Sequence, residues 1–237
     1  MNLHKKLLCT AGVALLLSST SLFASDQSAR DILNKAYQYI GSMDQYAFIA
    51  TVADEAEGDA KTYKHNISVK VDRTGKLRVD TTGTVKNRSA YLNDDSYTMI
   101  EHGHNCYAQM KTPKTINASL DLLFEKFGIR APLAQLIYNS MDKKVRFSTG
   151  KYFGTKDVGG VVCDYVAFKN NTREIHFWIA TGDQPLIKSY SIIDKSTNAK
   201  SRVNTTVKWD TNAKISESDF VFVAPKGSSK ISVNKTK

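Results

Sequence analysis

The chain lacks the residue patterns by which most enzymes are recognised. Its 237 residues contain no Gly-x-Ser-x-Gly turn and no His-Glu-x-x-His pair, which would mark a nucleophile or a zinc site. The clustered acids Asp44, Asp54, Glu55 and Glu57 precede turns, where acidic residues are common. Because no acid and base are paired, we predict a protein without catalytic activity and without a cofactor or bound metal.

Cysteine is scarce, with only Cys9, Cys106 and Cys163 in the whole chain. Cys9 precedes the N-terminal apolar run instead of following it, which argues against lipidation there. In an oxidising compartment Cys106 and Cys163 could form a disulfide, worth about 4 kcal/mol on the chain-entropy model. Two small buried thiols are the alternative, and the sequence leaves both open.

Long apolar runs are missing except at the N-terminus. Lys5 and Lys6 precede the run 7–17, and small polar residues lead to Ala24, which together predict a signal peptide over 1–24. The run is shorter than the ~20 residues of a spanning helix, so an uncleaved anchor is the lesser alternative. We therefore expect a secreted, periplasmic protein with one domain over 25–226 and a polar tail over 227–237.

Acidic residues are outnumbered, with 23 Asp and Glu against 33 Lys and Arg. The lysines are scattered through turns and strands, so the excess fits either solubility or attraction to anionic lipid head groups. Outside the cytoplasm nucleic acid is a poor partner, and we predict none.

Apolar periodicity predicts a mainly β protein with a few helices. Ala29, Ile32, Leu33, Ala36 and Ile40 form one helical stripe, which Gly41 is expected to end. Strand patterns then recur with turn signals at β-meander spacing. The predicted strands are 46–52, 63–71, 77–81, 85–92, 97–101, 106–110, 145–155, 161–168, 174–180, 186–193 and 202–209, with a short twelfth at 220–223.

Two helical segments interrupt the strands. Thr115 is a candidate N-cap for the stripe that ends at Phe127, and Pro132 can begin a second short helix. Both are too apolar to stand in water and cannot pair with strands. The fold prediction is therefore a curved antiparallel half-barrel of about eleven strands, with an N-terminal helix and inserted helices over its concave face. Such an arrangement leaves either a lined cavity or a filled core.

Several short motifs, in this order, resemble the bacterial family of predicted periplasmic proteins called domain of unknown function 2092. They are PLAQLIY at 132–138, GTKDVGGVVCD at 154–164, VAF at 166–168, FWI at 177–179 and PL at 185–186. The resemblance implies the LolA/LolB lipoprotein-carrier fold, a half-open barrel whose known members carry acyl chains. Many family members carry a histidine two places after the cysteine, where this chain has Tyr165, which weakens any metal or catalytic role there.

The predicted ligand is apolar or lipid-like, and its site is the concave cavity. The residues expected to line it are Phe48, Ile116, Leu120, Leu123, Phe124, Phe127, Leu136, Phe168, Phe177 and Trp178.

The sequence leaves three hypotheses about function to be tested. The favoured one is a periplasmic carrier or sensor of a lipid or acyl chain, with an anionic membrane surface or an envelope protein as a further partner. An envelope regulatory or scaffold module that binds a peptide or protein is the second. The third is metal binding through His102, His104 and Cys106, which share strand spacing, although Gly103 and Asn105 indicate an exposed turn.

Overall fold

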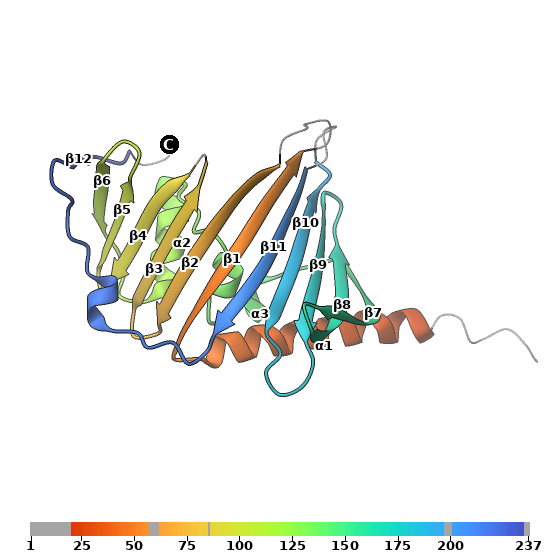
Figure 1. The fold of residues 1–237 in the computed structure, drawn as a ribbon. Helices are drawn as coiled ribbons and strands as arrows, with labels where there is room; N and C mark the ends of the chain where they lie inside the picture. Colours follow the sequence, from red (N-terminus) through yellow and green to blue (C-terminus); the bar gives the residue numbers. More distant parts are fainter. Residues whose placement is uncertain (1–19, 57–61, 85, 197–200, 235–237) are drawn as a thin grey trace, which may run out of the picture.

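The computed structural model describes residues 20–56, 62–84, 86–196 and 201–234, and it confirms the predicted fold class. Figure 1 shows one open, curved sheet. The strands are β1 (Gln45–Ala56), β2 (Tyr63–Asp72), β3 (Lys76–Gly83), β4 (Asn87–Asn93), β5 (Ser96–Glu101), β6 (Cys106–Lys111), β7 (Thr149–Val158), β8 (Val161–Lys169), β9 (Arg173–Ala180), β10 (Ile187–Asp194), β11 (Ser201–Asp210) and β12 (Ser229–Ile231). The helices are α1 (Thr20–Ser42), α2 (Ile116–Phe127), η1 (Ala134–Leu136), α3 (Met141–Lys144) and η2 (Glu217–Phe220). In Figure 1, α1, α2 and α3 lie on one face of the sheet, while η2 lies apart from them, against Lys70 and Arg78 on the other face.

The sheet has the strand order β12-β6-β5-β4-β3-β2-β1-β11-β10-β9-β8-β7. Neighbouring strands are antiparallel except for β12, which runs parallel to β6. The pairing of β1 with β11 joins the two halves of the chain into one continuous surface. The sheet stays open, with β12 and β7 at its two edges.

The concave face is the one that the helices cover, and it holds the main hydrophobic core. Along β2, Ile67, Val69 and Val71 are buried on this face, as the period of two requires. The stripe of α1 packs against the same core, with Leu33 and Ile40 at most 2% exposed. The core therefore lies between one sheet face and the helices.

The start of α1 is tied to the edge strand β7. Asp26 accepts a hydrogen bond from the backbone N–H of Gly150, and Arg30 donates to the carbonyls of Phe147 and Ser148 at 3.2 Å each. Most of the predicted signal peptide falls outside the described residues. Among the described helices, none is both long and apolar enough to cross a bilayer.

The C-terminal segment corrects one sequence expectation and adds a strand that the sequence did not predict. The stretch predicted as a strand at 220–223 instead begins with the last residue of η2 and continues without regular secondary structure, and Phe222 packs on Tyr91 and Tyr107 on the convex face. Within the predicted polar tail, residues 229–231 form β12 beside β6. Both features depend on partners more than one hundred residues away in sequence, which no local pattern reveals.

Candidate functional site

The concave face is closed by a segment that we call the cover (residues 112–145), which contains α2, η1 and α3. The apolar stripe of α2 faces the sheet, with Ile116, Leu120 and Leu123 at most 4% exposed. Thr115 caps the helix through its hydroxyl, which accepts from the backbone N–H of Ala118, as its sequence position predicted. Gly128 ends the helix in the left-handed conformation at φ 65°.

Removing this cap gives a modest, local effect. We expect Thr115→Ala to lower the free energy of unfolding by about 1 kcal/mol, because one backbone N–H at the helix start loses its acceptor. Urea unfolding followed by circular dichroism measures the change. Thr115→Ser keeps the hydroxyl and should restore most of it, whereas equal losses in both variants would contradict the capping role.

Two side chains fasten the cover to the sheet. The buried hydroxyl of Tyr46 donates to the carbonyl of Leu136 at 2.7 Å. Arg73, in the turn between β2 and β3, donates to the carbonyl of Ile137, to the carbonyl of Ile40 at 3.2 Å and to the Tyr46 hydroxyl at 3.0 Å. One guanidinium thus joins the sheet, the end of α1 and the cover.

The cover is also bonded to itself. Asn117 donates to the side chain of Asn139 at 2.6 Å, and Tyr138 donates to the carboxylate of Asp121 at 2.8 Å. Burial and the Asp121 carboxylate raise the pKa of Tyr138 above its ordinary value, which keeps its hydroxyl protonated as a donor. Lys144 adds an ion pair to Asp121 at 3.0 Å. These contacts make α2 and the segment after it one unit.

Most of the residues predicted to line a cavity belong to the one hydrophobic core cluster on the concave face. The sheet contributes Phe48, Phe168 and Phe177, each at most 1% exposed; Phe177 meets Tyr37 of α1 and Phe168 stacks on Phe147. The cover contributes the remaining members, which are Ile116, Leu120, Leu123 and Leu136, all buried, and Phe127, which is partly buried. These side chains pack in one hydrophobic cluster, so in this structure the cover fills the space over the concave face at its centre.

Two predicted lining residues lie elsewhere. Trp178 occupies the convex face, because adjacent strand residues point to opposite sides and Phe177 points into the core. Its ring stacks on Tyr165 with centroids 4.9 Å apart. Phe124 is 48% exposed on the outer side of α2, where it lines a separate cavity of about 260 Å³ under Arg130.

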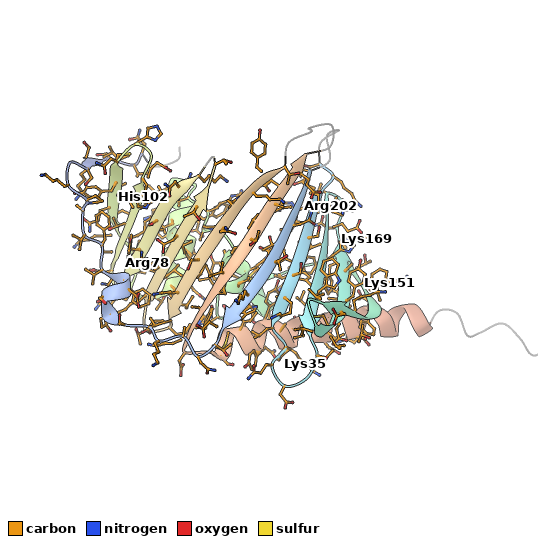
Figure 2. All side chains as sticks on the ribbon, viewed as in Figure 1. Lys35, Arg78, His102, Lys151, Lys169 and Arg202 are labelled. Carbon is orange, nitrogen blue, oxygen red and sulfur yellow. The ribbon has the colours of Figure 1, made fainter. Side chains whose placement is uncertain are left out.

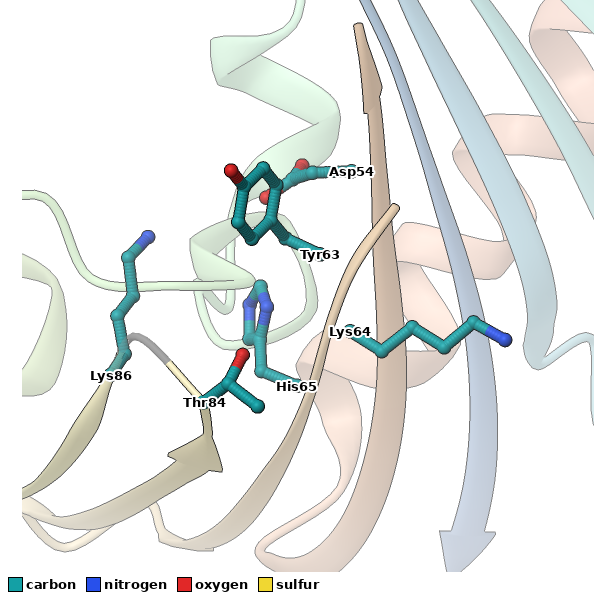
Figure 3. Close-up of a pocket in the computed structure, with 6 residues that line it drawn as sticks. All are labelled: Asp54, Tyr63, Lys64, His65, Thr84 and Lys86. Carbon is teal, nitrogen blue, oxygen red and sulfur yellow. The ribbon is translucent and has the colours of Figure 1, made fainter. Parts of the chain in front are cut away.

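A pocket of about 310 Å³ opens at one end of the concave face and is shown in Figure 3. We call it the rim pocket; it is lined by Asp54, Tyr63, Lys64, His65, Thr84 and Lys86. Figure 3 shows the side chain of Lys64 extending away from the other five. The sequence had marked Asp54 only as a turn acid, so spacing alone missed this grouping.

The rim pocket is the polar end of an otherwise apolar surface. Along the concave side of β1, buried Val52 is followed two residues later by Asp54, and along β2 His65 precedes buried Ile67. Burial and the nearby Lys86 lower the pKa of His65 below its ordinary value, although Asp54 opposes the shift. His65 is thus neutral near pH 7, and Lys86 is the cation of the pocket.

The structure does not support the disulfide or the metal site. Cys106 and Cys163 are both free, because β6 and β8 stand near opposite ends of the sheet. His102 contacts the hydroxyl of Ser89 at 2.9 Å in the turn before β6. Within the described ranges, no three His, Cys, Asp or Glu side chains gather closely enough to hold a metal ion.

Comparison with known proteins identifies relatives by family and by fold. The family model described as "Predicted periplasmic protein (DUF2092)" matches residues 29–234. No curated protein sequence matches the chain significantly.

Similar solved structures share little sequence with this chain. An uncharacterized conserved protein from Thermus thermophilus is 10% identical to this chain, with a TM-score of 0.50. The match covers 86% of this chain and 99% of the Thermus chain. Lipoprotein LppX from Mycobacterium tuberculosis is 12% identical, with a TM-score of 0.49, and the match covers 81% of this chain and 100% of the LppX chain. A LolA superfamily protein from Nitrosomonas europaea is 7% identical, with a TM-score of 0.41, and the match covers 84% of this chain and 98% of the Nitrosomonas chain. At 10% identity, the similarity to the Thermus thermophilus protein is evidence about the fold alone.

Proposed function

Because the chain belongs to the DUF2092 family of predicted periplasmic proteins, we propose that it binds a single-chain, lipid-like amphiphile in the periplasm and does no chemistry on it. The hydrocarbon tail lies on the concave face under the cover, and the head group lies in the rim pocket. The observation that carries this proposal is the change along β1 and β2 from buried apolar residues to Asp54 and His65, which line the rim pocket together with Lys86 from the segment before β4.

The tail takes the place of side chains from the cover. Leu120, Leu123 and Leu136 are buried over the concave face in this structure, and they are carried by one bonded unit. Movement of that unit exchanges its leucines for the tail on the same apolar surface. Each buried methylene contributes about 0.8 kcal/mol, so a long chain can offset the lost packing.

Native mass spectrometry of the delipidated protein tests uptake directly. The probe is palmitoyl lysophosphatidylglycerol, and we expect one bound molecule that survives transfer to the gas phase. Repeated delipidation and reloading without uptake would count decisively against the proposal. Capture of envelope peptides by the same preparation would then favour the regulatory alternative.

Charge removal in the rim pocket should weaken binding of this anionic probe. We expect Lys86→Gln to raise the dissociation constant roughly fivefold, because one exposed ion pair with the phosphate contributes about 1 kcal/mol. Isothermal titration calorimetry measures the change. Lys64→Gln is the matched control, since it removes the same charge from a side chain that points away (Figure 3). Equal weakening by the two variants would place the head group elsewhere.

A further inference from the structure

A second cavity, of about 600 Å³, lies at the β7 edge of the sheet and is distinct from the rim pocket. We call it the edge groove; it is lined by Asp26, Ser148, Thr149, Gly150, Lys151, Phe153, Ala167, Phe168, Lys169, Glu174 and Lys195. Figure 2 places Lys151 and Lys169 together at this end of the molecule. The rim pocket lies at the ends of β1, β2 and β3, several strands away in the sheet order.

The charges of the edge groove do not cancel. Asp26 is paired with Arg30 at 2.9 Å and also accepts from the Gly150 backbone, and Glu174 is paired with Lys195 and with His176. Lys151 and Lys169 are exposed, and neither has an acid partner among the described residues. Two cations are therefore left for an external anion.

The remainder of the lining is apolar and partly exposed. Phe153 is 44% exposed and stacks on Tyr165, with centroids 4.8 Å apart. The ammonium of Lys151 lies 5.1 Å from the Phe153 ring centroid. An exposed aromatic ring beside long-stemmed lysines matches the lipid interface, where the ring enters the acyl boundary and the ammonium groups meet phosphates.

The shape of β7 disfavours a peptide as the occupant. A peptide that extends a sheet needs a regular edge, but the register of β7 shifts between Tyr152 and Thr155. Gly154 within this bulge has φ 83°. From the unmatched lysines, the exposed ring and the irregular edge, we propose that the edge groove docks the protein on an anionic membrane surface. Docking is separate from uptake under the cover, so either can fail without the other.

Vesicle sedimentation with the full chain tests the docking site. We expect binding to vesicles of equal parts phosphatidylglycerol and phosphatidylcholine and little binding to phosphatidylcholine alone. Lys151→Gln with Lys169→Gln should lower the partition coefficient roughly 30-fold, since each lysine near an anionic surface contributes about a factor of five or more. The matched control is Lys35→Gln with Lys208→Gln, which removes two exposed lysines outside the groove and leaves binding nearly unchanged.

The aromatic ring supplies an independent readout. Phe153→Ala should reduce partitioning severalfold while Phe153→Tyr keeps most of it, and Trp178 fluorescence should be quenched by vesicles that contain brominated acyl chains. Equal losses in the two lysine pairs would show that net charge alone drives binding and would overturn the site. So would capture of a poly-glutamate peptide, or of inorganic phosphate, without any vesicle binding. Thermal unfolding of each variant confirms that the fold is intact.

Discussion

Arg73→Ala is expected to lower the free energy of unfolding by about 3 kcal/mol and to loosen the cover. The guanidinium donates to the carbonyls of Ile40 and Ile137, and its loss leaves both without this donor in a partly buried place. Hydrogen bonds from a charged donor contribute about 1.5–3 kcal/mol each, and buried orphaned acceptors add a penalty. Urea unfolding measures the stability, and hydrogen exchange across residues 129–139 measures the cover.

Two controls separate this fastening role from simple charge loss. Arg73→Lys keeps the charge but not the planar fork that reaches several acceptors at once, so it should recover less than half of the loss. Arg78→Ala removes an arginine that is 31% exposed on the convex face, where it pairs with Asp80 and donates to the carbonyl of Asp219, and it should cost less than Arg73→Ala without loosening the cover. We also expect Arg73→Ala to take up lysophosphatidylglycerol faster than wild type, because its cover is looser, and Arg78→Ala to take it up at the wild-type rate. Wild-type exchange rates in the cover of Arg73→Ala would contradict the role.

The strands were predictable because their signal is local. Ile67, Val69 and Val71 alternate with polar residues, and the turn at 73–76 separates β2 from β3. The eleven strands predicted before residue 210 are all present, and the stripe of α2 with its Thr115 cap is where the sequence placed it. Period and turn chemistry settle such elements without knowledge of their partners.

The sequence could not reveal which elements meet. Gly41 was expected to end the first helix, but α1 runs on to Ser42. A Cβ at Gly41 would lie only 2.4 Å from the carbonyl oxygen of Asn139 in the cover, so the glycine permits a close approach between distant segments. Arg73 shows the same limit, because it lies in a turn and its acceptors are up to 64 residues away in sequence.

The sequence determined only in part which face of the sheet each strand residue occupies. Strand alternation already separates Phe177 from Trp178, so only one of them could face the concave side. Which one does so depends on α1, whose Tyr37 meets Phe177 edge-on at 6.4 Å. For the two cysteines the sequence provided no answer at all, because only the order of the strands reveals that β6 and β8 are far apart.

Leu136→Ala should produce the largest loss of stability with a functional signature. Leu136 is fully buried between the cover and the sheet, beside the Tyr46 hydroxyl that its carbonyl accepts from. Truncating a buried leucine costs about 2–5 kcal/mol because a cavity remains, and the unfolding temperature should fall by roughly 10 °C. If the hydrocarbon tail occupies this same space, lysophosphatidylglycerol should restore more of the unfolding temperature in the variant than it adds to wild type.

Leu33→Ala provides the matched comparison, because Leu33 is equally buried but belongs to α1. It should lose stability in the same range without gaining extra from the ligand, since its cavity lies away from the proposed tail position. Differential scanning fluorimetry over a ligand series measures both variants against wild type, and calorimetry supplies the dissociation constants. Equal rescue of the two variants would mean that the amphiphile stabilises any weakened protein. Rescue confined to Leu136→Ala places the hydrocarbon tail between the cover and the concave face, because binding energy can refill a cavity only where the ligand lies.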